Sequence, residues 1–136
     1  MLEVLFCSGK ILSMAGGKII NYNAAVWPHE MRSASILCKA GYTVEFKPSD
    51  NTHRSADMFL NGEEYELKSP EGRTIRCIER NIKRGLKQSQ NIAIDSHRVK
   101  YLRDASIVSY LKNNKSRFAP VKKIIFISRK GEIIEI

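Results

Sequence analysis

Hydrophobic and polar residues alternate with a period of two in several short stretches of the chain, which is typical of β-strands with one buried face. The clearest pair is SADMFL and EEYELK, separated by Asn61-Gly62, the dipeptide that most strongly favours a two-residue hairpin turn. The run NIAID predicts a short buried strand, and the C-terminal KKIIFISRKGEIIEI predicts a strand pair that turns near Lys130-Gly131. Strands are therefore expected at 42–46, 55–60, 63–68 and 91–95 and within 122–136.

Apolar residues that recur every three to four positions predict helices elsewhere in the chain. One helix is expected to begin at Pro28, which favours a first turn, and to end near Gly41, which favours a helix terminus. Two more are expected at 75–90 and 101–114. The central order is α-β-β-β-α-β, which predicts an α/β fold with a central mixed β-sheet flanked by helices.

The first 27 residues hold short apolar pieces broken by glycines, so a lead-in segment with only a loose strand or two is expected there. Residues 28–136 are expected to form a single domain, because a chain of 136 residues is long enough for one core. Apolar residues make up 43% and charged residues 27%, which excludes disordered, collagen-like and membrane-embedded classes. Glu3 interrupts the N-terminal apolar run, so neither a signal peptide nor a membrane segment is expected.

The outlying property is the net charge of +9, which surrounds so small a protein with a positive field. Such a field attracts nucleic-acid phosphates, acidic proteins or anionic lipid, and charge alone does not choose among them. Cys7, Cys38 and Cys77 are odd in number and lack a C-x-x-C spacing. Neither a disulfide framework nor a zinc site is therefore predicted.

The hairpin carries the strongest chemical indication. A two-residue turn fixes its register and places Asp57 opposite Glu66, with Lys68 two residues further along on the same face. Like charges at directly opposite positions destabilise a strand pair, and a shared divalent cation removes that repulsion. Mg²⁺ favours one or two carboxylates together with waters and phosphate oxygens, so Asp57 and Glu66 are candidate metal ligands. Lys68 is then placed to stabilise charge on a phosphate or to orient the attacking water.

The same hairpin has a plainer interpretation, in which Lys68 only screens two surface acids on an exposed face. From the hairpin alone the two interpretations are equally supported. A second E-x-K sequence occurs at 45–47, but no aspartate precedes it anywhere in the chain. The complete set of two acids and a lysine is therefore expected once, at 57, 66 and 68.

Residues on two helices add support for a catalytic site that acts on nucleic acid. Glu30 borders the inward face of its helix, where a carboxylate needs a cation or a donor, although an acid there equally suits the helix dipole. The helix at 75–90 has a basic stripe with one acid, Glu79, to offset it. A solvated face is the plainer interpretation, and phosphate binding is the one we favour. The stripe comprises Arg76, Arg80, Lys83, Arg84 and Lys87.

Asp57 followed by the E-L-K of 66–68, within this order of elements, resembles the PD-(D/E)xK nuclease superfamily. More specifically, residues 28–98 resemble the tRNA-nuclease toxin domain at the C-terminus of contact-dependent growth inhibition CdiA proteins. The likeness rests on HEMRSASILCKAGYTVEF, SADMFLNGEEYELKS and IERNIKRGLKQSQNIAID. It implies a restriction-endonuclease-like core. Ala56 departs from the superfamily motif, because it stands where the motif has proline.

The resemblance also implies roles for individual residues. Asp57 and Glu66 match the metal ligands, and Lys68 matches the catalytic lysine. Glu30 matches the helix acid that many members place near the metal. Lys87 and Gln90 match a basic and amide pair that reaches the scissile phosphate.

For a toxin of this kind the resemblance implies Mg²⁺ or another divalent cation, tRNA rather than DNA as the substrate, and a cognate immunity protein that is acidic. It implies carriage on a larger exported protein and action in the cytosol of the target cell; without a toxin role, a cytoplasmic location is expected. Two alternatives stay open. One is a DNA endonuclease of the same superfamily, and the other is a non-catalytic basic module that binds nucleic acid.

Other polar and aromatic residues are weaker candidates. Asp95 ends a predicted strand and is a turn residue or a minor member of the site. His97 is expected to be an ordinary polar residue, because isolated histidines usually are. Trp27, Tyr101 and Tyr110 are suited to stacking on bases, but aromatic residues that flank helices usually belong to the core.

Overall fold

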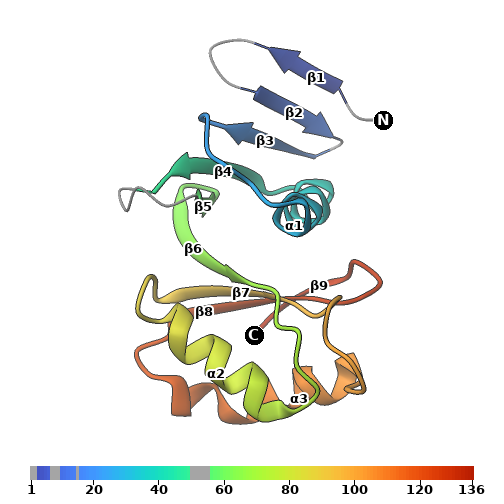
Figure 1. Ribbon diagram of the computed structural model, residues 1–136, viewed down its shortest axis with the longest axis vertical. Helices are drawn as coiled ribbons and strands as arrows, with labels where there is room; N and C mark the ends of the chain where they lie inside the picture. The colour runs from blue at the N-terminus through green and yellow to red at the C-terminus, as the bar shows by residue number, and fades with distance from the viewer. Residues whose placement is uncertain (1–2, 7–9, 15, 50–55) are drawn as a thin grey trace. The chain divides into compact units, whose positions relative to one another are not determined.

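The computed structural model describes residues 3–6, 10–14, 16–49 and 56–136, and the side chains of the last two ranges (Figure 1). Cys7 and Ser55, which entered the sequence-based expectations, lie outside the described residues. The chain forms two compact units, the N-terminal unit Met1–Tyr65 and the C-terminal unit Glu66–Ile136. The boundary falls inside strand β6 (Glu63–Lys68). The expectation of a single domain over 28–136 stays a prediction.

The N-terminal unit contains mixed strands and one helix. Its first two strand pairs are antiparallel, the third pair, β3 with β4, is parallel, and the later pairs are antiparallel again. Helix α1 connects the two parallel strands and packs against both, as a crossover between parallel strands requires. The first residues contribute three strands, which is more order than the loose lead-in that was expected. The elements are β1 (Glu3–Phe6), β2 (Lys10–Met14), β3 (Gly17–Asn21), α1 (Pro28–Lys39), β4 (Thr43–Pro48), β5 (Ala56–Leu60) and the first half of β6.

Alternation along β4 and β5 builds the buried side of this unit. Val44 and Phe46 of β4 pair with Leu60 and Met58 of β5, and all four side chains are buried. The alternate residues of the two strands, which include Glu45 and Asp57, point to the other face. These two acids therefore lie on the polar side of β4 and β5.

The hairpin between β5 and β6 has the predicted turn. Asn61 and Gly62 have φ angles of 50° and 85°, and both positive values are what a type I′ turn needs. Asn61 also fastens the turn to β4, because its Oδ1 accepts the Thr43 N–H at 2.9 Å and its own N–H donates to the Thr43 carbonyl at 2.9 Å. The register confirms three predicted pairs, Leu60 with Glu63, Phe59 with Glu64 and Met58 with Tyr65.

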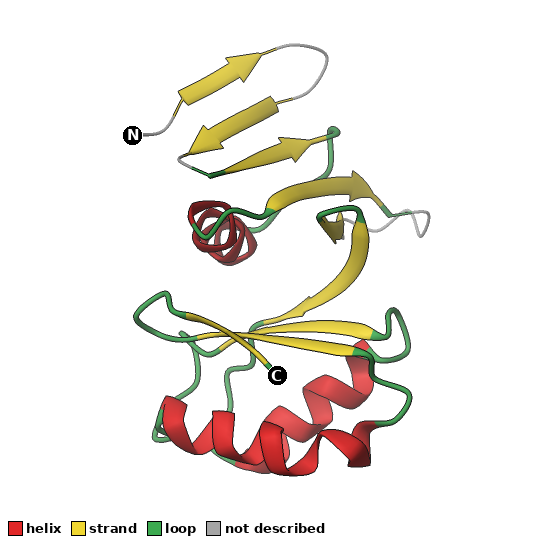
Figure 2. Ribbon diagram, turned by 180° about the vertical axis from the view of Figure 1, so that it is seen from behind, coloured by secondary structure: helices red, strands yellow, loops and turns green. Residues whose placement is uncertain are grey.

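In the C-terminal unit, two helices cover one face of the strands, as two opposite views show (Figures 1 and 2). The second half of β6 runs parallel to β7, β7 runs parallel to β8, and β9 is antiparallel to β8. Isoleucines from α2, β7 and β8 make up half of the buried core residues between these layers. The elements are α2 (Ile75–Gly85), β7 (Asn91–Asp95), α3 (Asp104–Asn114), the short 3₁₀ helix η1 (Lys115–Phe118), β8 (Lys123–Ile127) and β9 (Ile133–Glu135).

The α-β-β-β-α-β order and the α/β class are confirmed. Two helices are shorter than the sequence predicts. Helix α2 ends at Gly85, because the residues that follow form a turn, and α3 starts at Asp104, because Tyr101 has a φ of 66° that a right-handed helix excludes. None of the helices in the described ranges is long and apolar enough to cross a membrane.

Candidate active site

Glu66 and Lys68 occupy the half of β6 that belongs to the C-terminal unit. In the parallel pairing with β7, Glu66 lies beside Ile92 and Lys68 beside Ile94, and both isoleucines face α2 and α3. The Lys68 Nζ lies 4.0 Å from the Glu66 Oε1, and the two side chains are 25% and 29% exposed. The ion pair is thus largely sheltered by protein and still reachable from solvent.

Gly85, at the end of α2, lies directly against this ion pair. A Cβ atom added at Gly85 would lie 3.3 Å from the Glu66 Cγ and 3.5 Å from the Lys68 Cε. It would also come within 2.8 Å of the Ile92 Cδ1, which is closer than real Cβ atoms approach. The absence of a side chain at Gly85 therefore lets the helix end pack onto the strand where the two charged groups emerge.

Lys87 and Gln90 follow in the turn after α2, and both are exposed. The Lys87 N–H donates to the Arg84 carbonyl at 3.2 Å, and the Gln90 carbonyl accepts the Lys122 N–H at 2.8 Å. These backbone bonds hold the turn that begins at Leu86, directly after Gly85. The structure therefore places both predicted residues in the turn that follows the helix end packed against Glu66 and Lys68.

Asp57 belongs to the N-terminal unit and lies on the polar face of β5. Its pairing partner on β4 is Lys47, whose Nζ lies 4.4 Å from the centre of the Phe59 ring. The pKa of Glu64, on the neighbouring strand, is raised above its ordinary value by partial burial and then by the nearby Asp57 carboxylate. Asp57 therefore has both a cation and a second acid close to it within this unit.

The E-x-K sequence at 45–47 is a neighbour of the candidate aspartate, which the sequence analysis missed. No aspartate precedes it in the chain, but pairing across β4 and β5 places Asp57, from later in the sequence, beside it. Glu45 also accepts a hydrogen bond from the Tyr22 hydroxyl at 3.1 Å. No local pattern reveals this neighbour, since it depends on strand order.

The predicted opposition of Asp57 and Glu66 stays a prediction. The pairs recorded between β5 and β6 end at Met58 with Tyr65, and Asp57 and Glu66 belong to different units. Within the described residues, no group of three or more histidine, cysteine, aspartate or glutamate side chains is placed to hold a metal ion. Two carboxylates are nevertheless the number that Mg²⁺ commonly takes from a protein, so the donor chemistry of Asp57 and Glu66 fits that ion.

Glu30 acts as a helix cap. Its Oε1 accepts the N–H of Trp27 at 2.8 Å, which satisfies a donor at the start of α1. Between Glu30 and Asp57 the described part of the chain records no hydrogen bond or ion pair. The geometry thus supports the dipole and capping interpretation of Glu30, and its role near a metal stays a prediction.

The basic stripe of α2 lies on the exposed side of the helix. Lys83 donates to the Glu79 Oε1 at 3.0 Å, and the Glu79 Oε2 accepts the Tyr110 hydroxyl of α3 at 2.9 Å. Glu79 therefore neutralises one member of the stripe and ties two helices together. The other members, Arg76, Arg80 and Arg84 of α2 and Lys87 of the turn after it, are exposed and present a positive surface to solvent.

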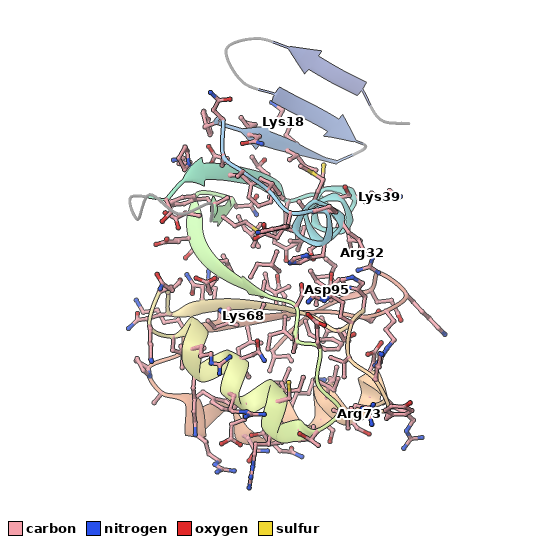
Figure 3. The ribbon with its side chains drawn as sticks, viewed as in Figure 1. Lys18, Arg32, Lys39, Lys68, Arg73 and Asp95 are labelled. Atoms are coloured by element: carbon pink, nitrogen blue, oxygen red, sulfur yellow. The ribbon has the colours of Figure 1, made fainter. Side chains whose placement is uncertain are left out.

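Asp95 and His97 form a pair at the end of β7. Asp95 is fully buried, and its Oδ1 accepts the His97 backbone N–H at 3.0 Å and lies 3.2 Å from the His97 Nδ1. Because Ile94 is the partner of Lys68, Asp95 points to the opposite face of the strands, and Figure 3 shows the two residues apart. The pair is a local turn interaction and not part of the Glu66 and Lys68 site.

Comparison with known proteins shows the family to which these residues belong. The model of the contact-dependent growth inhibition CdiA C-terminal domain matches residues 54–133, which include Asp57, Glu66 and Lys68. Among solved structures, the chain is similar to a CdiA-CT/CdiI toxin and immunity complex from Burkholderia pseudomallei. The likeness has a TM-score of 0.70 at 21% identity over 89% of this chain and 98% of that chain, which concerns the fold alone.

A comparison with curated proteins finds no match. The family match, by contrast, extends over more than half of the sequence and includes β5, β6, α2, β7, α3 and β8. The chain therefore belongs to the family of contact-dependent growth inhibition CdiA C-terminal domains.

Proposed function

We propose that this domain is the toxin part of a contact-dependent growth inhibition system and acts as a metal-dependent nuclease, with tRNA as its preferred substrate. The observation that carries the proposal is the sheltered pair of Glu66 and Lys68 at the end of a basic helix. An acid beside an ammonium group, next to a surface that attracts phosphates, is what phosphodiester hydrolysis requires.

Each residue has a distinct part in this proposal. Lys68 donates to an oxygen of the scissile phosphate and stabilises the negative charge that develops there. Its ion pair with Glu66 orients the ammonium group before substrate binds. Asp57 and Glu66 would hold a divalent cation, which would supply charge stabilisation and an activated water. Lys87 and Gln90 contact oxygens of the same phosphate from the turn after α2.

The basic stripe of α2 binds the phosphates that flank the cleaved bond. Arg76, Arg80 and Arg84 are exposed on the helix whose last residue packs against Glu66 and Lys68. Guanidinium groups bind phosphate oxygens in a bidentate manner, so the stripe orients the strand as well as attracting it. Affinity for RNA is therefore expected to fall steeply as salt rises.

Membership of the family supports a route by which the domain reaches a target cell and a protein partner that inhibits it. The domain is carried at the end of a larger exported protein and acts in the cytosol of a target cell. The related Burkholderia structure is described as a complex of a toxin with an immunity protein. By analogy, a cognate immunity protein with an acidic surface binds this basic domain and blocks cleavage in the producing cell.

The decisive experiment incubates the protein with total tRNA and with plasmid DNA, each with Mg²⁺ and with chelator. The wild type should cut tRNA only when Mg²⁺ is present, and Lys68→Ala should lower the rate by about 10²-fold or more. Lys130→Ala is the matched control, because Lys130 is an exposed lysine in the β8–β9 turn. Circular dichroism of all three proteins confirms equal folding.

Three results would contradict the proposal in different ways. Cleavage of plasmid alone would identify a DNA endonuclease. Binding of both nucleic acids without any cleavage would identify a non-catalytic basic module. Cleavage of tRNA that survives chelation would refute the metal requirement and indicate attack by the ribose 2′-hydroxyl.

A further inference from the structure

Tyr101 is the most exposed large aromatic residue of the described chain. Its side chain is 81% exposed, and its backbone φ of 66° lies in a region that bulky residues seldom adopt. Tyr110, by contrast, is half-buried and packs edge-on against Phe118 with 6.2 Å between ring centres. The expectation that both tyrosines are core residues is therefore wrong for Tyr101, which lies in solvent before the first turn of α3.

Arg73 lies against one side of the Tyr101 ring. Its guanidinium carbon is 5.0 Å from the ring centre, and within the described ranges Arg73 has no carboxylate partner. A guanidinium group at this distance is attracted by the π-electrons of the ring and holds it in place. With so much of its side chain in solvent, Tyr101 keeps its other ring face open.

The two segments that carry this pair are fastened to each other. The Lys100 N–H donates to the Gly72 carbonyl at 3.1 Å, and the Arg98 guanidinium forms an ion pair with the Glu71 carboxylate. The pair of Arg73 and Tyr101, which we call the platform, is therefore held by two backbone segments that are joined to each other. Preorganised groups of this kind lose little conformational entropy when they bind a ligand.

The charge around the ring is positive. Glu71 is neutralised by Arg98, and Asp104 binds Arg129, with 2.6 Å between the Arg129 Nη1 and the Asp104 Oδ1. Arg73 lies against the ring, and Lys100 and Arg103, which flank Tyr101 in the sequence, are exposed cations without a carboxylate partner among the described residues. An open aromatic face surrounded by cations is the arrangement that proteins use to bind a stacked nucleobase and its phosphates.

The basic stripe connects this platform to the candidate active site. Arg73 precedes the first turn of α2 and Lys68 lies by its last residue, so the two residues occupy opposite ends of the helix (Figure 3). Eleven helical residues span about 16 Å. Arg76 and Arg80 lie on the exposed side between these ends.

We propose that Tyr101 and Arg73 form a stacking site for one unpaired nucleobase of an RNA strand, whose backbone follows α2 toward Lys68. This inference rests on the proposed nuclease function and assigns the class of substrate that the domain selects. Bases in a duplex are stacked on their neighbours and cannot reach the ring, so the site selects loops and single strands. A tRNA offers such bases in its loops and at its 3′ end.

The test measures binding in the Lys68→Ala background, where cleavage does not interfere. A fluorescently labelled single-stranded RNA and a duplex of the same length are titrated with the protein, and anisotropy gives each affinity. Tyr101→Ala should weaken single-strand binding about tenfold, and Tyr101→Trp should preserve it, because stacking requires only a π-face. Duplex affinity should be almost unchanged in both. Tyr22→Ala is the matched control, since Tyr22 is also exposed but bonded to Glu45.

A second readout detects stacking directly. An RNA that carries 2-aminopurine at each position in turn should lose fluorescence at one position on binding Lys68→Ala, and the loss should disappear with Tyr101→Ala. Equal single-strand affinity of the parent and Tyr101→Ala, or quenching that persists without Tyr101, would overturn the inference. An effect of Tyr101→Ala on immunity-protein affinity alone would assign the surface to a protein partner and also overturn it.

These results are separable from the proposed function. Stacking at Tyr101 without Mg²⁺-dependent cleavage by the wild type would refute the nuclease and leave the RNA contact standing. Mg²⁺-dependent cleavage by the wild type without stacking at Tyr101 would refute the RNA contact and leave the nuclease function standing.

Discussion

Gly85 approaches Glu66 so closely that a single added methyl group would lie 3.3 Å from the Glu66 Cγ. Glycine has a low helix propensity, and the C-cap of α2 at Leu86 is right-handed, so no left-handed conformation requires a glycine at this helix end. Close packing accounts for Gly85 instead. The reason is the strand beneath it, where Glu66 and Lys68 emerge. The geometry of the candidate site thus depends on a residue with no chemistry of its own.

Replacing Gly85 with alanine should therefore affect activity more than stability. Alanine improves helix propensity by about 1 kcal/mol, which offsets part of the contact with Ile92. The Glu66 side chain must give way slightly, because its Cγ would lie 3.3 Å from the added carbon, so tRNA cleavage should fall about tenfold or more, since a small displacement of catalytic groups is costly. Thermal melting and cleavage rates of the same preparation check this expectation.

The double variant Gly85→Ala with Ile92→Val provides the control. It removes the Ile92 Cδ1, the atom that lies 2.8 Å from the added carbon. Stability should recover while activity stays low, because the contacts with Glu66 and Lys68 remain. Full activity in the single variant would show that the close approach of α2 has no role in the site.

A divalent cation should stabilise the folded protein if Asp57 and Glu66 bind it together. At a tenfold excess over its dissociation constant, a ligand of the native state contributes about 1.4 kcal/mol. Mg²⁺ or Mn²⁺ should raise the melting temperature of the wild type and not that of Asp57→Asn or Glu66→Gln. Glu45→Gln, which alters another acid of the same N-terminal unit, should keep the shift. The same shift in all four proteins would mean that the cation binds elsewhere.

The hydrogen bond between Tyr110 and Glu79 should make stability depend on pH. The pKa of Glu79 is lowered from its ordinary 4.5, first by the hydrogen bond from Lys83 and then by that from Tyr110. A depressed carboxyl pKa contributes stability that is present above the unfolded value and is lost as the pH falls through the folded value. Tyr110→Phe should therefore melt a few degrees below the wild type at pH 7.

The difference between the two proteins should shrink toward pH 3, as Glu79 becomes protonated in both. Melting curves across this range check the expectation, and Lys83→Met, which removes the other donor, should show the same trend. A Tyr110→Phe deficit that stays constant with pH would mean that lost packing, and not the carboxylate, accounts for it.

Residue patterns within single segments predict most of the strands and helices of the fold. Asn61-Gly62 predicts both the turn and the three β5–β6 pairs, because a two-residue turn leaves no freedom in register. Period-two alternation likewise predicts that Met58 and Leu60 are buried while Asp57 is not. The end of α2 was placed too late, since the basic and amide residues after Gly85 are good helix formers, although they form a turn in the structure.

The parts that sequence reasoning missed depend on contacts between distant segments. Lys47 becomes a neighbour of Asp57 through the pairing of β4 with β5, and the E-x-K strand had been set aside for lack of an aspartate. Arg73 and Tyr101 meet because two loops are joined by one backbone hydrogen bond and an ion pair. No periodicity within a single segment carries such information.

The hairpin turn should tolerate little change at Gly62. Its φ is 85°, and a Cβ atom there would meet no atom within 4 Å, so backbone conformation is the whole cost of a side chain. Gly62→Ala should destabilise the protein by about 1–2 kcal/mol. Urea denaturation measures the change, and Glu63→Ala, at the exposed next position, should be nearly neutral. A neutral Gly62→Ala would imply that the turn adopts another conformation.

Arg129 should be one of the most important charged residues for the stability of the C-terminal unit. Its Nη1 lies 2.6 Å from the Asp104 Oδ1, its Nη2 donates to the Val99 carbonyl at 2.6 Å, and its backbone N–H donates to the Asp104 Oδ2 at 2.9 Å. Ser96, which is buried, donates to the same Asp104 carboxylate at 2.7 Å. The segments after β7 and β8 are thus fastened to the start of α3 through one carboxylate.

Arg129→Met should lower the free energy of unfolding by about 2 kcal/mol, because charged hydrogen bonds are lost at a site that is only partly open to solvent. Asp104→Asn should cost a similar amount, and the double variant should cost less than the sum, since each change removes the same contacts. Lys130→Met, at the exposed neighbouring position, should have little effect. Additive costs in the double-mutant cycle would show that Arg129 and Asp104 stabilise the unit independently, in spite of the 2.6 Å between them.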